Sequence, residues 1–303
     1  MGGPITNSIP RCTALKSIMK YLPMNTWWKE YYGWVGVLVV VFMELSALLD
    51  IPHINIWVTP VAWYGYILLF DWLVYKKSAQ SLLMTNFKEF LIMLPSSVAL
   101  WCVFELHNLC FLNWEYVQLP DSNILTAIGF VTSFATILPA LYVTYLYLRE
   151  ISFLQIKVTP HMYSKRRLLL EIIFGIALII VATAYPSRYT GPLIWPCYLF
   201  VFVPLNYLLG VPSVLKEREA GNYRDMLAMF CSGYICGFFW EFFNFWAGSK
   251  WVYHVPFLHD IKIFEMPIVG FLGFGPFAIA FIEMYRFLMY FPHWLTVHTR
   301  KKI

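Results

Sequence analysis

The chain is built from long apolar segments separated by short polar or charged connections. An apolar run of about 17–25 residues is long enough to cross a lipid bilayer as an α-helix. The pattern therefore predicts an all-α, polytopic integral membrane protein with about eight transmembrane helices. The expected segments are 33–49, 56–75, 90–111, 124–148, 168–186, 194–213, 228–247 and 266–290.

Composition supports the same class of protein. The 303 residues are 60% hydrophobic and 13% charged, whereas a soluble domain is roughly 45–50% apolar and about 25% charged. The net charge of +5 does not indicate a nucleic-acid partner, because the Lys and Arg residues lie between apolar segments and form no basic patch interleaved with aromatic residues. We expect the lipid bilayer as the principal partner and no nucleic acid.

The distribution of basic residues favours one orientation. If the N-terminus is cytoplasmic, most Lys and Arg residues fall on the cytoplasmic side, as the positive-inside rule requires. The prediction is a plasma (inner) membrane protein with both termini cytoplasmic. Its parts are a cytoplasmic N-terminal segment (1–32), a first membrane repeat (33–148), a basic cytoplasmic linker (149–167), a second membrane repeat (168–290) and a basic cytoplasmic tail (291–303).

The two membrane halves resemble each other in sequence. Residues 86–108 align without a gap on residues 222–244, with six identical positions at an offset of 136. Composition bias alone does not readily produce matched polar residues at matched spacing. Because each half holds four predicted helices, both halves have the same orientation in the membrane, and the sequence predicts two parallel four-helix repeats.

The strongest candidate site lies at the end of the seventh segment. Glu241 and Asn244 are one helical turn apart within an aromatic, apolar run, and Glu105 and Asn108 repeat this spacing in the third segment. Acidic side chains at membrane depth are rare and mark functional sites by default, so all four are candidate catalytic residues. The alternative is that these polar groups tie helices together by hydrogen bonds. The sequence leaves both interpretations open.

An aromatic Trp-x-Tyr motif follows each Glu/Asn pair, and aromatic residues also surround Glu241. We predict an aromatic cavity near the external face, in which a lipophilic small molecule would bind. Glu44, in the outer half of the first segment, is a further acid that could join this cavity. The candidate substrate-binding residues are Trp240, Trp251, Tyr253, Trp114, Tyr116 and Glu44.

The external loop 248–265 is richer in basic residues and histidines than its counterpart in the first half, which adds His254 to the catalytic candidates. An ordinary solvated loop would have the same composition. His254, His259, Asp260 and Glu241 are ligand types for zinc or iron, but their spacing matches no compact signature such as HExxH. We predict no metal site, and the sequence leaves any cofactor unknown.

Two features of the eighth segment carry structural predictions. Glu283 and Arg286 are three residues apart on a helix, which predicts an ion pair that neutralises both charges. Residues 267–277 contain three glycines and two prolines, which predicts a broken or kinked start of the helix.

Three functional hypotheses from different classes follow. The first is an intramembrane enzyme that acts on a lipid or isoprenoid, with Glu241 as the acid–base group and Asn244 orienting it. The second is a small transporter with Glu/Asn sites at the repeat interface. The third is a membrane scaffold or assembly subunit whose polar pairs only hold the bundle together.

Overall fold

The computed structural model describes residues 26–151, 154 and 156–300. Within these residues eight helices are long and apolar enough to cross a membrane, and the only strands are short. The prediction of an all-α, multi-pass membrane protein is confirmed at this level. Residues 1–25 and 301–303, which belong to the predicted cytoplasmic ends, lie outside the described residues.

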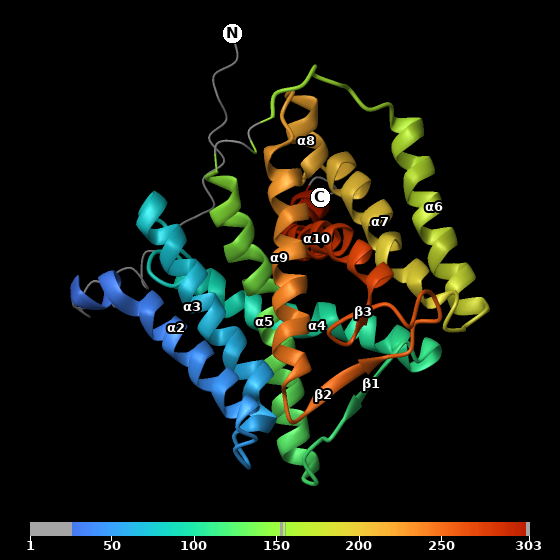
Figure 1. Cartoon of the computed structure of the whole chain (residues 1–303). Coiled ribbons are helices and arrows are strands. Elements are labelled where there is room, and N and C mark those ends of the chain that lie inside the picture. The colour runs from blue at the N-terminus through green and yellow to red at the C-terminus, as the bar shows by residue number, and fades with distance from the viewer. Residues whose placement is uncertain (1–25, 152–153, 155, 301–303) are drawn as a thin grey trace.

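Eight long helices form the bundle shown in Figure 1. They are α2 (Thr26–Leu48), α3 (Val58–Ser78), α4 (Phe87–Phe111), α5 (Asn123–Arg149), α6 (Lys165–Ala184), α7 (Ile194–Leu209), α9 (Arg224–Phe245) and α10 (Phe274–Arg300). A short helix, α8 (Val214–Glu219), connects α7 to α9. The strands are β1 (Trp114–Val117), β2 (Lys250–Tyr253), β3 (Lys262–Ile263) and β4 (Met266–Pro267).

Each half of the chain contains the same set of packed helix pairs. In the first half α2 packs on α3, α3 on α5 and α4 on α5; in the second half α6 packs on α7, α7 on α10 and α9 on α10. The halves meet where α5 packs along α9. Helices α2 and α6 therefore lie at opposite flanks of the bundle, as Figure 1 shows.

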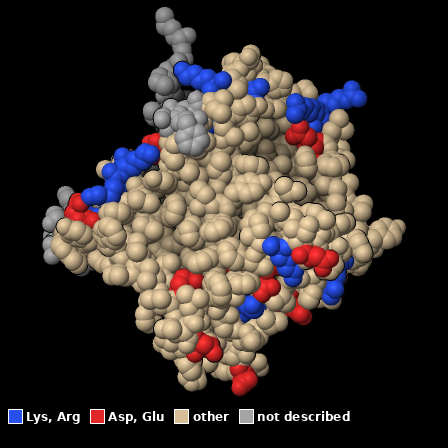
Figure 2. All heavy atoms as spheres, in the orientation of Figure 1, with Lys and Arg blue, Asp and Glu red and all other residues tan. Residues whose placement is uncertain are grey.

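The long helices alternate in direction, so the bundle has two distinct ends. One end carries β1 and β2 and is called the ladder end below. At the opposite end α5 finishes and α6 and α9 begin, and we call it the linker end. Figure 2 shows charged side chains along the upper edges and in the lower part of the visible face, with a wide uncharged band between them.

A serine supports α5 where a proline interrupts its hydrogen bonds. Pro139 lies inside α5 and has no N–H to donate to the preceding turn. Ser97 of α4 accepts a hydrogen bond from the Leu138 N–H over 3.0 Å and donates its hydroxyl to the Phe134 carbonyl oxygen. The hydroxyl thus ties α4 to α5 at the disturbed turn.

Two glycines let α10 approach α9 closely. A Cβ atom on Gly233 would lie 2.1 Å from the Phe274 carbonyl oxygen, and one on Gly237 would lie 2.3 Å from the Phe274 ring. The run predicted to break the helix forms a 3-10 turn, Ile268–Gly273, immediately before α10. Since Glu241 is one turn beyond Gly237, it lies on the face of α9 that this segment covers.

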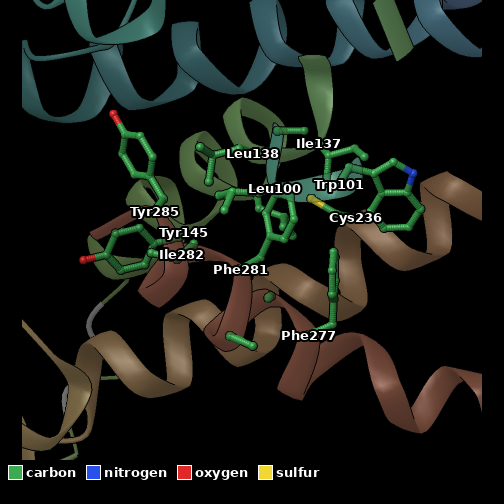
Figure 3. Packing of buried hydrophobic residues seen from close by; sticks show 14 of the residues in the cluster. Leu100, Trp101, Ile137, Leu138, Tyr145, Cys236, Phe277, Phe281, Ile282 and Tyr285 are labelled. Atoms are coloured by element: carbon green, nitrogen blue, oxygen red, sulfur yellow. The ribbon is translucent and has the colours of Figure 1, made fainter. Parts of the chain in front are cut away.

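The core is aromatic and lies between the two halves. Figure 3 shows rings and aliphatic side chains from α4, α5, α9 and α10 packed together in its centre. Trp101 and Phe104 of α4 meet Phe277 of α10 with ring centroids 6.0 and 5.4 Å apart. These ring contacts pack α4 against α10 on the inner side of the ladder.

Candidate functional site

The first feature of the site is a two-stranded antiparallel ladder that joins the halves. Strand β1 follows α4 and strand β2 follows α9. In the register of the ladder Trp114 is opposite Tyr253, and Tyr116 is opposite Trp251. Each Trp-x-Tyr motif therefore pairs with the other, and both candidate carboxylates are brought to the same end of the bundle.

The asparagines predicted from the sequence hold the ladder strands against the helices. The Asn108 side-chain amide donates to the Trp114 carbonyl over 2.8 Å, and its carbonyl accepts from the backbone N–H groups of Asn113 and Trp114. Asn244 donates to the Trp251 carbonyl over 2.8 Å and accepts from the Trp251 N–H over 2.9 Å. Both asparagines are buried. Their observed contacts fit the structural interpretation of these residues.

The carboxyl group of Glu105 is tied to three donors. Its Oε1 atom accepts from the Tyr116 hydroxyl over 2.6 Å, from Trp101 Nε1 over 2.7 Å and from Trp114 Nε1 over 3.3 Å. One donor comes from the same helix and two come from the strand that follows it. Glu105 therefore acts as a hydrogen-bond centre for the first half.

The carboxyl group of Glu241 has fewer partners. Its Oε1 atom accepts from the Tyr253 hydroxyl over 2.7 Å, and Trp251 Nε1 donates to that hydroxyl, also over 2.7 Å. Glu241 is fully buried, and among the described residues its Oε2 atom has no hydrogen-bond partner. A buried oxygen of this kind costs free energy unless a proton, a water or a ligand satisfies it.

The two tyrosines of the ladder keep their protons. Burial, followed by the adjacent Glu241 carboxyl, raises the pKa of Tyr253 well above its usual value. Burial and then Glu105 raise the pKa of Tyr116 in the same way. Each phenol is therefore a hydrogen-bond donor to its glutamate at neutral pH.

An aromatic cavity of about 670 Å³ lies beside the ladder. Its volume is within the range of roughly 300–1,000 Å³ that is typical of small-molecule sites. Of the predicted substrate-binding residues, five line it: Trp114, Tyr116, Trp240, Trp251 and Tyr253. The two glutamates are not among the lining residues that the structure describes, because the Trp and Tyr side chains bonded to them form the wall in front.

Two of the predicted candidates lie elsewhere. Glu44 is buried in α2, is not among the described residues that line the cavity, and both of its carboxyl oxygens lack a hydrogen-bond partner among those residues. His254 lies just after β2, and its Nε2 atom is 2.8 Å from Oε1 of Glu115 on β1. This pair joins the two strands on the outer side of the ladder, where Glu115 is 59% exposed.

Several lining residues were not predicted from the sequence. Trp101 is four residues before Glu105, so helix geometry places the two on one face, and this spacing was the available signal. Trp63 and Trp195 also line the cavity, but they come from α3 and α7, and no local pattern links them to either glutamate.

The linker end has its own buried polar network. Glu283 accepts from Asn206 Nδ2 over 2.6 Å, from the Val214 N–H over 3.0 Å and from Arg286 over 3.0 Å. The predicted ion pair is therefore present, with two additional donors. Arg149 is 2.7 Å from Asp225 and links α5 to α9.

No protein-family model matches this chain, and no curated protein or solved structure shows significant similarity to it. The geometry of the site is therefore the basis on which a function is assigned.

Proposed function

We propose that this membrane protein binds a lipophilic molecule, a lipid or an isoprenoid, in the aromatic cavity and acts on it as an intramembrane enzyme. Glu241 is the acid–base group, and Tyr253 connects it to the cavity. One observation carries the proposal: Tyr253 lines the cavity and donates to a buried carboxyl whose second oxygen lacks a described partner.

The surroundings of Glu241 suit proton transfer. A carboxyl group in an apolar setting is a recurring general acid or base, because small changes nearby shift it between its two protonation states. Tyr253 donates to Oε1, while Oε2 is left for a proton or a polar group of the substrate. Asn244 orients the site indirectly, since it fixes the start of β2 through Trp251.

The sequence similarity between the two halves suggests how the site is arranged in the membrane. We propose that the halves are two parallel repeats and that the ladder lies on their common axis, which runs along the membrane normal. The pairing of Trp114 with Tyr253 and of Tyr116 with Trp251 supports this arrangement, because exchanging the repeats reproduces the same two pairs. With both termini cytoplasmic, the ladder end and the cavity would face the outside. The plasma (inner) membrane stays a prediction.

The test is mass spectrometry of organic extracts from protein purified in mild detergent. Wild type, Glu241→Gln and Glu105→Gln are compared, since the two substitutions make the same chemical change at matching positions. We expect near-stoichiometric lipophilic material with wild type and Glu105→Gln. With Glu241→Gln we expect a different mass or amount, because the proton-transfer group is lost.

Protein folding must be checked alongside. Gel filtration and thermal unfolding establish that each variant is folded before its extract is compared. If the Glu241→Gln extract is the same as that of wild type, the acid–base role is wrong. If all three proteins carry only bulk membrane lipid, the binding role is wrong as well.

A transporter is the second candidate, favoured by the position of the cavity. Its inner limit is near Leu141 and Cys236, and the ion pairs of Arg149 with Asp225 and of Arg286 with Glu283 lie beyond it toward the linker end. A cavity that ends before a layer of charged pairs resembles one half of an alternating-access pathway. Ion- or pH-coupled uptake into proteoliposomes would favour transport over the enzyme.

A further inference from the structure

One face of α5 lines the cavity along most of the length of the helix. The lining residues recur with helical spacing, which keeps them on a single side. They are Leu125, Thr126, Gly129, Phe130, Ser133, Phe134, Thr136, Ile137, Ala140 and Leu141. The cavity is therefore a groove that runs parallel to α5 and is not a compact chamber.

The dimensions of this groove restrict what fits in it. At about 1.5 Å per residue, the distance from Leu125 to Leu141 along α5 is about 24 Å. A cavity of about 670 Å³ has the volume of a site for one small molecule, so a ligand that extends over this whole length is long and narrow. A single hydrocarbon chain has this shape. The groove is also longer than one leaflet of the membrane, which is about 15 Å thick.

The two ends of the groove differ in polarity. At the ladder end the lining includes Ser249, Lys250 and Asn113. The Lys250 ammonium group contacts Glu265 at 2.6 Å and the Phe245 carbonyl oxygen at 3.4 Å. Since an ammonium group has three N–H donors, one is left for an acceptor on a ligand.

The inner end offers no such donor among the described residues. Cys236 lines the cavity there, and its sulfur is 3.4 Å from the Thr144 hydroxyl. Thr144 donates to the Ala140 carbonyl over 2.8 Å, so Tyr66, at 2.8 Å, is the donor in its bond to Thr144. These groups satisfy one another, and the surface that meets a ligand is apolar.

We propose that the ligand is a single-chain lipid. Its chain lies along α5 with the free end near Cys236, and its hydrogen-bond-accepting head group lies beside Lys250. This assignment rests on the lipophilic-ligand part of the proposed function and does not depend on the acid–base role of Glu241.

Gly129 provides a way to block the groove without disturbing the fold. It lines the cavity midway between Leu125 and Ser133, and a Cβ atom built on it would meet no described atom within 4 Å. Leucine also favours a helix more than glycine does, so Gly129→Leu places a side chain in the groove without a folding cost. Ala127→Leu is the matched control, because Ala127 is exposed on a different face of α5.

The experiment uses brominated lipids as quenchers of tryptophan fluorescence, because seven tryptophans line the cavity: Trp57, Trp63, Trp101, Trp114, Trp195, Trp240 and Trp251. The probes are a brominated fatty acid, a monoacylglycerol and a diacyl phospholipid with the same brominated chain. Each is titrated into full-length protein in mild detergent. We expect saturable quenching by at least one single-chain probe, with affinity at least tenfold weaker in Gly129→Leu and unchanged in Ala127→Leu.

The possible outcomes test the single-chain ligand and the acid–base role of Glu241 separately. Saturable quenching by the diacyl probe at equal affinity, or equal binding by wild type and Gly129→Leu, would overturn the single-chain assignment. A polycyclic molecule in the extract would do the same and leave the proposed lipophilic ligand intact. Saturable single-chain binding with an unchanged Glu241→Gln extract would instead reject the acid–base role and keep the ligand class. The preferred probe identifies the head group as a carboxylate or a hydroxyl.

Discussion

The two glutamates at the ladder end occupy matching positions but have different surroundings. Glu105 receives three hydrogen bonds on one oxygen, whereas Glu241 receives one and leaves its second oxygen without a described partner. Asn108 and Asn244, in contrast, make nearly the same contacts with their strands. The asparagines therefore have the same structural role in both halves, whereas the two glutamates differ in the number of hydrogen bonds that they accept.

The cause of the difference lies on α9. The donor Trp101 corresponds to Gly237 at the offset of 136, and Gly237 is small because the Phe274 ring packs against it. The second tryptophan of each site also has a different acceptor. Trp114 donates to the Glu105 carboxyl, whereas Trp251 donates to the Tyr253 hydroxyl. Close packing of α10 thus removes one donor from the second half and leaves Glu241 incompletely satisfied.

The largest predicted effect is a difference in stability between two alanine variants. Glu105→Ala leaves three buried donors without their acceptor, and Glu241→Ala leaves one. Each unsatisfied donor costs about 1–3 kcal/mol, so we expect losses of about 3–9 kcal/mol for Glu105→Ala and about 1–3 kcal/mol for Glu241→Ala. Unfolding in mixed detergent and SDS micelles measures both values.

Glutamine variants are the controls for this pair. Glu105→Gln keeps an acceptor oxygen in place and should lose less stability than Glu105→Ala. Equal losses of stability for the two alanine variants would mean that the different hydrogen bonding of Glu105 and Glu241 has no energetic consequence. The structural role assigned to Glu105 would then be wrong.

This difference was only partly visible in the sequence. Hydropathy predicted the helices because length and apolarity are local properties, and the Glu-x-x-Asn and Trp-x-Tyr motifs marked the ends of α4 and α9. The pairing of β1 with β2 joins residues 133–139 apart in the chain, and no local pattern determines such a register. The unequal partners of Glu105 and Glu241 follow from that register and from the Gly237 contact with Phe274.

The sequence predicted an aromatic cavity but not all of the helices that form its wall. Aromatic residues near Glu241 indicated a cavity, yet its wall includes Trp63 and Trp195, which reach it only through the packing of α3 and α7. Glu44 was expected to join it, and its location in α2 places it outside the described lining.

At the linker end, Arg149 and Arg286 also occupy corresponding positions in the sequence alignment of the two halves. Arg286 pairs with Glu283, and its guanidinium group also lies 3.9 Å from Asp225. Arg149 lies closer to Asp225, at 2.7 Å, and the Asp225 N–H donates to Glu217 over 2.8 Å. Burial, followed by the neighbouring Asp225 carboxyl, raises the pKa of Glu217 to about 7. Arg149, which makes the closer contact with Asp225, is therefore part of a pH-sensitive cluster with Glu217.

The intermediate predicted effect is on the pH dependence of stability. Since the pKa of Glu217 is raised in the folded state, that state binds more protons than the unfolded state. The resulting contribution to stability is complete below the unfolded pKa of Glu217 and is lost as the pH rises through about 7. Glu217→Gln keeps the acceptor for Asp225 and should narrow the gap in melting temperature between pH 5 and pH 8. Glu219→Gln on the same short helix is the control, and an equal narrowing there would reject the assignment.

The smallest predicted effect on stability concerns His254 and Glu115, the pair on the outer side of the ladder. His254 is 29% exposed, Glu115 is 59% exposed, and their side chains are 2.8 Å apart. Surface pairs contribute about 0–1 kcal/mol, because solvent screens the charges and the side chains lose conformational freedom. A double-mutant cycle with His254→Gln and Glu115→Gln should therefore give a coupling below about 1 kcal/mol, and the lipid extract of His254→Gln should equal that of wild type. If His254→Gln instead changes the extract as Glu241→Gln does, the histidine takes part in the chemistry. The proton path would then cross the ladder from Glu115 and would not be confined to Tyr253 and Glu241.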